Sequence, residues 1–343
     1  MRSTVLLLLS LFISILFLAG CSEDSTTAPP LQQFTTSAWV VNSLSSTLSR
    51  VDLDSGDVTV NVLSLGTFAN DIAVSGTMAY VVNSGDNQIQ IVDLTTGQTD
   101  GTIEILLGMN PWAIAVDGSQ RGYVTNYLTG NVSVLDLVSR QESDTLVVGT
   151  SPEGVCIHQD VLYVTDVNLV WPVYGQGYVH AYSLPDLDHV AVIPVATNPQ
   201  VVLPGPDGMI HVVCTGDFGA VTGQVQLIDP ATHSVVDSIA LGEYPGSLAF
   251  SQGVGFLGYS RLDGTGAILS YDVFARQVLR GADNPIPVNS GVWDVVATPE
   301  GRLLACCFGA DQVVELETDG TVVATYDVGN GPQAVGVAEL PEE

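Results

Sequence analysis

Short runs of alternating apolar and polar residues recur along most of this chain, separated by turns rich in Gly, Asp and Asn. The clearest run, residues 79–93, reads Ala-Tyr-Val-Val-Asn-Ser-Gly-Asp-Asn-Gln-Ile-Gln-Ile-Val-Asp. Alternation over such short segments predicts β-strands. Degraded copies recur at spacings of 41 to 47 residues. Aligned on the residue that ends the run, the seven copies fall at Asp52, Asp93, Asp136, Ser183, Asp229, Asp272 and Glu317. Repeats of this length are typical of propeller blades.

One copy shows how a repeat divides into strands. Within residues 111–148, four strands are expected, at 111–116, 122–126, 131–136 and 144–148. Four strands joined by Gly, Asp and Asn turns form an antiparallel meander, which is one blade. The sequence therefore predicts an all-β fold, a seven-bladed β-propeller of four-stranded antiparallel blades over residues 36–341.

The two ends of the repeat region are complementary. Residues 332–337 are an inner strand with nothing after it, whereas residues 38–42 are a second strand with no inner strand before it. We expect the C-terminal strand to pair with the N-terminal blade, which closes the ring and covers the edges that an open sheet exposes.

Two short motifs recur in phase with the repeat. The second strands include Tyr-Val-Val-Asn at 80–83 and Tyr-Val-Thr-Asn at 123–126, and Gly-x-x-Pro turns precede several inner strands, as at 149–152. Gly and Pro suit the turn from an outer strand to the next inner strand. The chain resembles the YVTN family of propeller repeats over nearly all of its mature length. That resemblance implies a surface protein of bacteria or archaea.

The N-terminus is expected to carry an export signal. An apolar run from Val5 to Phe17 is too short to span a membrane and precedes a small-residue cleavage site. The sequence Leu-Ala-Gly-Cys at 18–21 resembles the lipobox of bacterial lipoproteins. It implies a lipoprotein signal peptide over 1–20, acylation of Cys21 and a membrane anchor; an ordinary secretory signal is the alternative. Residues 21–35 are polar and predict a flexible tether.

The anchor implies a place in the bacterial cell envelope. Ser22 follows the acylated cysteine, and in Gram-negative bacteria a residue other than Asp there commonly goes with the outer membrane.

The composition is strongly acidic. The formal net charge is -29, and the chain contains no lysine. Such a surface repels nucleic acids and anionic lipid headgroups, so we expect no nucleic-acid partner. The acidic surface leaves calcium open, but no cofactor is expected. The acidic segment 52–57 is interpreted as a hairpin between the third and fourth strands, because it lacks the twelfth-position Glu of a calcium-binding EF-hand loop.

Cysteine and histidine give no sign of a metal or catalytic centre. The four remaining cysteines fall inside expected strands and are interpreted as buried apolar residues: Cys156, Cys214, Cys306 and Cys307. The five histidines have no partner at ligand spacing and are interpreted as structural or exposed: His158, His180, His189, His211 and His233. We therefore name no catalytic residue and no metal ligand.

The candidate binding face lies at one end of the central channel. In a propeller, the loops that enter inner strands and the loops between second and third strands emerge on the same face, here called the upper face. The residues after each Gly-x-x-Pro turn are expected to ring the channel mouth, namely Asn70, Trp112, Glu153, Gln200, Gly246, Trp293 and Gln333, with Asp71 and Asp294 behind them. The alternative is that these side chains only pack the loops together.

Three consecutive blades have longer loops between their second and third strands, at 166–177, 215–223 and 260–266. Loops that lengthen on one side of a rigid scaffold often carry function. They add five candidate residues to the upper face: Trp171, Tyr174, Phe218, Arg261 and Asp263. Drift in loop length is the alternative.

These features together favour a non-catalytic binding or scaffold lipoprotein, a monomeric propeller that holds an envelope protein, a peptide or a glycan. A second hypothesis is a propeller enzyme similar to lactonases or to a streptogramin lyase. Such an enzyme would have to use Asp71, Glu153 and Asp294 at the channel mouth. A third is an accessory protein of a periplasmic redox system, which no haem, copper or quinone motif supports.

Overall fold

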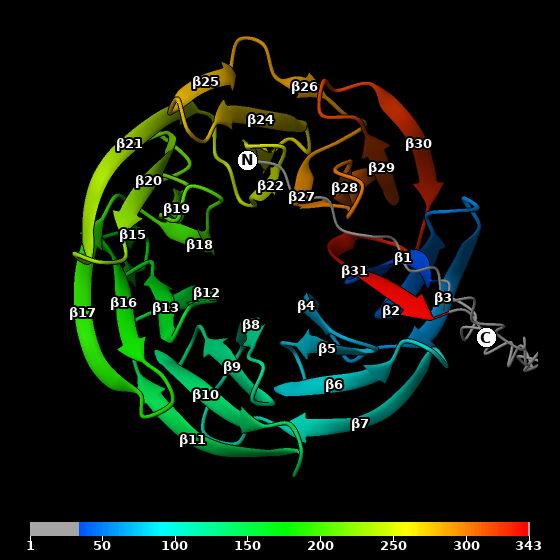
Figure 1. The fold of residues 1–343 in the computed structure, drawn as a ribbon, viewed down its shortest axis with the longest axis horizontal. Coiled ribbons are helices and arrows are strands. Elements are labelled where there is room, and N and C mark those ends of the chain that lie inside the picture. The colour runs from blue at the N-terminus through cyan, green and yellow to red at the C-terminus, as the bar shows by residue number, and fades with distance from the viewer. Residues whose placement is uncertain (1–33, 342–343) are drawn as a thin grey trace, which may run out of the picture. The chain divides into compact units, whose positions relative to one another are not determined.

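The computed structural model describes residues 34–341, which form seven antiparallel sheets arranged in a ring (Figure 1). The expected signal peptide, Cys21 and the tether up to residue 33 lie outside the described residues. The seven-bladed propeller predicted from the repeats is confirmed. Phe34 and Thr35, which we assigned to the tether, belong instead to the first strand because they pair with the last strand of the chain.

The blades are numbered in chain order, and each is given from its inner to its outer strand. Blade 1 contains β4 (Ala69–Ser75), β5 (Met78–Asn83), β6 (Gln88–Asp93) and β7 (Gln98–Glu104). Blade 2 contains β8 (Pro111–Val116), β9 (Arg121–Asn126), β10 (Asn131–Asp136) and β11 (Gln141–Val147). Blade 3 contains β12 (Pro152–His158), β13 (Val161–Asp166), β16 (Gly177–Ser183) and β17 (Asp188–Val195). Blade 4 contains β18 (Pro199–Pro204), β19 (Ile210–Cys214), β20 (Gly223–Asp229) and β21 (Ser234–Gly242).

The remaining blades follow the same order with two irregularities. Blade 5 contains β22 (Ala249–Ser251), β23 (Val254–Ser260), β24 (Gly266–Asp272) and β25 (Gln277–Arg280), with the short β26 (Ile286–Pro287) added beside β24. Blade 6 contains β27 (Val292–Ala297), β28 (Leu303–Cys307), β29 (Gln312–Leu316) and β30 (Val322–Asp327). Blade 7 contains β31 (Pro332–Pro341), β1 (Phe34–Asn42), β2 (Thr47–Asp52) and β3 (Val58–Ser64), so it joins the two ends of the repeat region.

Blade 7 closes the ring as predicted. Its inner strand β31 pairs antiparallel with β1, from Phe34 opposite Pro341 to Asn42 opposite Pro332. Buried apolar side chains then fill the spaces between neighbouring blades; Val213 of blade 4, for example, lies in one cluster with Leu257 of blade 5. Because one such cluster lies between each pair of neighbouring blades, the core is a belt around the ring rather than a single centre. Each fully buried Val or Leu contributes roughly 1.5 to 3 kcal/mol.

The Asn of the YVTN-like motif is a buried packing residue. Asn126 is fully buried at the end of β9, and its amide donates to the Ser133 hydroxyl of β10 at 2.8 Å. Gly108 lies against this amide, where a Cβ atom would overlap it. The same pairing of a glycine with a buried Asn occurs for Gly66 with Asn83 and for Gly329 with Asn42. The glycine that begins the entry turn of a blade and the Asn that ends its second strand therefore pack against each other.

The Asp that ends the third strand stabilises a turn. Asp52 Oδ1 accepts the backbone N–H groups of Asp54 and Ser55, at 3.1 and 2.9 Å. Asp136 and Asp272 accept two backbone N–H groups in the same way. Segment 52–57 is thus the β2–β3 hairpin, as predicted, because the carboxylate is used by its own turn.

The four cysteines of the described region are free and buried, as predicted. The described residues contain one helix, the three-residue 3₁₀ turn η1 (Phe308–Ala310). Over residues 34–341 no helix has the length and apolar character needed to cross a membrane.

Candidate functional site

A cavity of about 810 Å³ opens at the upper face of the ring, and all seven blades contribute to its wall. The predicted ring residues all line it: Asn70, Asp71, Trp112, Glu153, Gln200, Gly246, Trp293, Asp294 and Gln333. The inner strands β4, β8, β12, β18, β22, β27 and β31 stand closest to the centre of the ring (Figure 1). The tertiary structure thus brings together residues up to 263 positions apart, from Asn70 to Gln333.

A β-bulge aims these side chains at the cavity. In β4, Ala69 pairs with Asn83 and Asp71 pairs with Val82, so Asn70 has no ladder partner. The register shifts at the corresponding position in β8, β12, β18, β27 and β31. An extra residue in one strand bends that strand and redirects a side chain, and such bulges are common beside functional sites.

Asp71 and Asp294 connect neighbouring inner strands. Asp71 Oδ2 accepts the backbone N–H of Ile114 in blade 2 at 2.9 Å, and its Oδ1 accepts the N–H of Ile72 at 2.8 Å. Asp294 Oδ2 accepts the N–H of Val335 in blade 7 at 3.0 Å. Burial raises the pKa of both carboxyls; that of Asp294 reaches about 7, with a further rise from the charge of Asp71. Both groups hold the ring together as well as lining its mouth.

Glu153 differs from these two carboxyls. The residue is 5% exposed, and its Oε2 has no hydrogen-bond partner among the described residues. Burial raises the pKa of Glu153 to about 8. Burial, and then the charge of Glu153, raise the pKa of Tyr127 to about 12 and raise the pKa of Tyr174 above its usual value. At neutral pH the Glu153 carboxyl is therefore mostly protonated.

Aromatic side chains surround the mouth of the cavity. We call six of them the aromatic collar: Trp112, Tyr127, Tyr174, Phe218, Tyr244 and Trp293. Neighbouring members lie in contact, with ring centroids 5.7 Å apart for Trp112 and Tyr127, and 5.5 Å apart for Phe218 and Tyr244. Trp293 stacks on Phe308 of η1, outside the collar, at 4.6 Å.

Two residues of the collar, Tyr127 and Tyr244, are not among the predicted site residues. Tyr127 directly follows the Asn of the second-strand motif, and Tyr244 lies inside the Gly-x-x-Pro turn of blade 5. Both segments had been placed on the upper face, so their aromatic residues were the available signal.

The lengthened loops divide into two groups. Tyr174 and Phe218 belong to the collar, with ring centroids 6.3 Å apart. Trp171 lies between the short strands β14 (Leu169–Val170) and β15 (Val173–Tyr174); it is 85% exposed and does not line the cavity. Of the aromatic candidates in these loops, Tyr174 and Phe218 therefore lie at the cavity and Trp171 does not.

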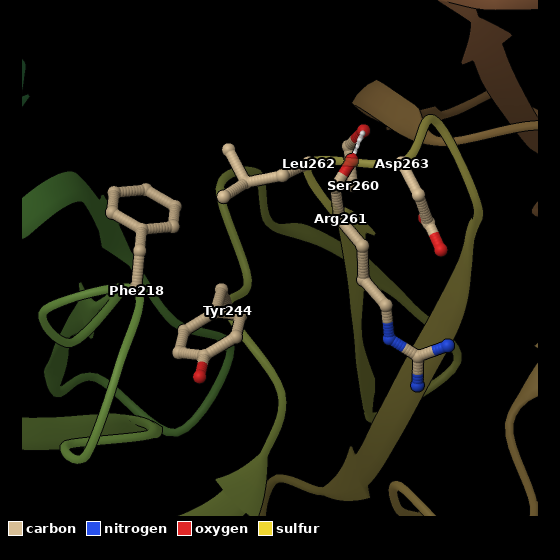
Figure 2. Close-up of a pocket in the computed structure, with 6 residues that line it drawn as sticks. All are labelled: Phe218, Tyr244, Ser260, Arg261, Leu262 and Asp263. Carbon is tan, nitrogen blue, oxygen red and sulfur yellow. Dashed lines mark hydrogen bonds between the residues drawn. The ribbon is translucent and has the colours of Figure 1, made fainter.

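Arg261 and Asp263 line an adjoining recess of about 280 Å³ with Leu262 and with Phe218, Tyr244 and Ser260, which also line the cavity (Figure 2). The Arg261 guanidinium forms an ion pair with Glu243, with Nε to Oε2 at 3.1 Å. Asp263 Oδ1 accepts the backbone N–H of Thr265 at 3.0 Å. Figure 2 shows both charged side chains turned away from Phe218 and Tyr244, so they do not extend the collar.

No histidine lines the cavity. His211 lies buried between blades 4 and 5, with Nε2 2.9 Å from Asp207 Oδ1 and Nδ1 2.6 Å from the Tyr271 hydroxyl. Because a carboxylate only accepts, Nε2 carries the proton and Nδ1 accepts from Tyr271. Among residues 34–341, no group of three His, Cys, Asp or Glu side chains is placed to hold a metal ion.

No protein-family model and no curated protein matches this chain. Many solved structures are similar to it, and two of them show the extent of the likeness. Kuenenia stuttgartiensis hydrazine synthase matches with a TM-score of 0.65 and 18% identity, over 80% of this chain and 95% of that one. A functionally unknown protein from Desulfotomaculum acetoxidans DSM 771 matches with a TM-score of 0.69 and 12% identity, over 90% and 100%. At such identities the likeness shows the fold alone, and the class of protein is a seven-bladed β-propeller.

Proposed function

We propose that this chain is a lipoprotein of the bacterial cell envelope whose propeller is a non-catalytic binding module for a protein, a peptide or a glycan. The cavity of about 810 Å³ at the channel mouth carries the proposal. Ligand sites are concave, mostly apolar and supplied with a few convergent polar groups, at volumes of about 300 to 1,000 Å³. The cavity meets this description with its aromatic collar, the amides of Asn70, Gln200 and Gln333, and three carboxyls.

The membrane part of the proposal is supported by the sequence. The lipobox-like residues 18–21 imply acylation of Cys21 ahead of a polar tether, and several acyl chains would give a stable anchor. Ser22 and the likeness to YVTN surface proteins support the outer membrane. Cys21→Ser should move the protein from the membrane fraction to the soluble fraction, measured by fractionation and by mass spectrometry of the N-terminal peptide. Equal membrane retention of the variant would contradict the anchor.

The binding part is tested by capture from the envelope fraction of the source cells. Trp112→Ala combined with Trp293→Ala removes two opposed parts of the collar and should abolish retention of the partner while the melting temperature holds. Phe274→Ala is the matched control, because Phe274 is 65% exposed and lies in the β24–β25 hairpin, away from the cavity. Equal retention by the double variant and the control would contradict a site at the channel mouth.

A second candidate function follows from the carboxyls. Glu153 and Asp294, with pKa values of about 8 and about 7, suit general acid–base catalysis near neutral pH. This favours the lactonase-type or lyase-type alternative. Turnover of lactone substrates that Glu153→Gln abolishes, or a metal found by elemental analysis and released by that variant, would replace the binding proposal.

A further inference from the structure

Glu153 stands apart on the cavity wall. Among the described residues that line the cavity, its Oε2 is the buried side-chain oxygen that has no hydrogen-bond partner. Asp71 and Asp294 use their oxygens on backbone N–H groups of their own or the next blade. Leaving a buried acceptor unpaired costs about 1 to 3 kcal/mol, and more for a charged group. The described chain therefore supplies no donor to this carboxyl, which distinguishes it from the other two carboxyls of the cavity wall.

Aromatic side chains line the same cavity as this carboxyl. The charge of Glu153 acts on the hydroxyls of both Tyr127 and Tyr174, which places it within their electrostatic reach. Trp112 packs against Tyr127 on one side, and Phe218 packs against Tyr174 on the other. Aromatic faces attract organic cations by roughly 0.5 to 2 kcal/mol each. A carboxylate in a cavity lined by such rings is suited to a positively charged group.

No positive side chain compensates the site from within. The lining residues include three carboxyls and no Arg or His, and the chain contains no lysine. The nearest basic residue of the upper-face loops, Arg261, is paired with Glu243. With a net charge of -29, the whole molecule attracts cations toward the channel mouth.

We propose that the recess beside Glu153 binds an organic ammonium group, either of a free amine or of a lysine side chain in a peptide. The inference rests on the proposed binding function and specifies its ligand. The ammonium binds the Glu153 carboxylate, while the rings of Trp112, Tyr127 and Tyr174 contact its alkyl chain. A neutral glycan, in contrast, would leave the Glu153 carboxyl protonated.

Few titratable groups compete with Glu153 for control of the pH response. The titratable or charged residues on the elements packed around Glu153 come from its own strand and from its neighbours. Strand β12 itself carries Cys156 and His158, β13 carries Tyr163 and Asp166, and β9 carries Arg121 and Tyr123. The loops add Tyr127 and Tyr174, and Asp71 and Asp294 lie across the cavity. The flanking inner strands β8 and β18 have no titratable side chain. Asp166 accepts the backbone N–H groups of Thr150 and Ser151.

The pH response distinguishes the two kinds of ligand. An ammonium group binds the ionised carboxylate, so its affinity should rise with pH through the Glu153 pKa of about 8. Between pH 7 and pH 9 the ionised fraction grows from about one tenth to about nine tenths, which predicts about a tenfold gain, while a lysine with a pKa of about 10.4 stays charged. A neutral ligand that needs the protonated carboxyl shows the opposite trend.

The test is calorimetric titration of the purified protein with four probes: an N-acetylated lysine tripeptide amide, its norleucine counterpart, n-butylammonium and n-butanol. Each cation should bind about tenfold more tightly at pH 9 than at pH 7, and more tightly than its neutral counterpart. Glu153→Gln should abolish the pH dependence. Glu300→Gln should retain it, because Glu300 is an exposed residue in the β27–β28 turn. Tighter binding of the lysine peptide than of n-butylammonium identifies a peptide ligand, and the reverse identifies a free amine.

Equal binding of the charged and neutral probes, or affinity that falls as the pH rises, would overturn the ammonium site. If Glu153→Gln does not fold, the variant Trp112→Leu tests the site instead. It should lower the affinity for both cations several-fold without changing the pH trend. An unchanged affinity would count against the site. Envelope capture through Trp112 and Trp293 is a separate measurement. It can succeed when the ammonium probes fail, so the two proposals fail separately.

Discussion

Replacing Glu153 by Gln should stabilise the protein, by an amount that grows with pH. The substitution keeps the shape of the side chain and removes a carboxyl that is 5% exposed and has an unpaired oxygen. Burial raises its pKa from an ordinary 4.5 to about 8. An acid whose pKa is higher in the folded chain holds more protons when folded, so the free energy of unfolding falls as the pH rises between these two values.

The size of the effect follows from the shift. One pKa unit corresponds to about 1.4 kcal/mol, so ionisation of Glu153 lowers the free energy of unfolding by roughly 3 to 4 kcal/mol between pH 5 and pH 8. The Gln variant does not ionise and escapes this loss. Wild type and variant should therefore have similar stabilities near pH 5, and the variant should be more stable by about that amount at pH 8.

The assay is urea unfolding followed by tryptophan fluorescence at pH 5, 6, 7 and 8, with the slope on denaturant compared between the two proteins. Glu300→Gln serves as the control for loss of one negative charge at an exposed position. A difference between wild type and Glu153→Gln that stays constant from pH 5 to pH 8 would refute the reasoning, because it would mean that the Glu153 pKa is ordinary. A position that destabilises its own fold while lining a cavity is typical of functional sites.

Two further predictions concern the frame that holds the site. Gly149→Ala should destabilise the protein by about 2 kcal/mol or more, because the added Cβ would overlap the Asp166 carboxylate, whereas Gly118→Ala, with open space around it, should be near neutral; comparable urea midpoints would contradict this. Tyr271→Phe leaves His211 Nδ1 without its donor and should cost about 1 to 3 kcal/mol. Burial lowers the pKa of His211, so the stability that neutral His211 contributes should be present above pH 6.5 and lost as the pH falls below that value. A thermal unfolding series from pH 7.5 to pH 5 checks this.

Much of the candidate site could be predicted because the repeat fixes the phase of every blade. A residue directly after a Gly-x-x-Pro turn occupies the same place in each blade, so Trp112 and Glu153 could be assigned to one mouth from spacing alone. Arg261 and Asp263 could not be excluded in that way. Their loop position was predicted correctly, but the ion pair with Glu243 and the bond to Thr265 depend on how the loop folds.

The sequence by itself determined the seven-bladed ring, its closure by the strand expected at residues 332–337 and the face on which the candidate residues lie, because strand alternation and a regular repeat are local properties of the chain. The tertiary structure decided which carboxyl is left without a partner. Asp71 and Asp294 find backbone donors in the next blade, and Glu153 finds none for Oε2. That difference arises from contacts between blades, so only the folded ring distinguishes the two carboxyls that brace neighbouring blades from the one whose Oε2 has no partner.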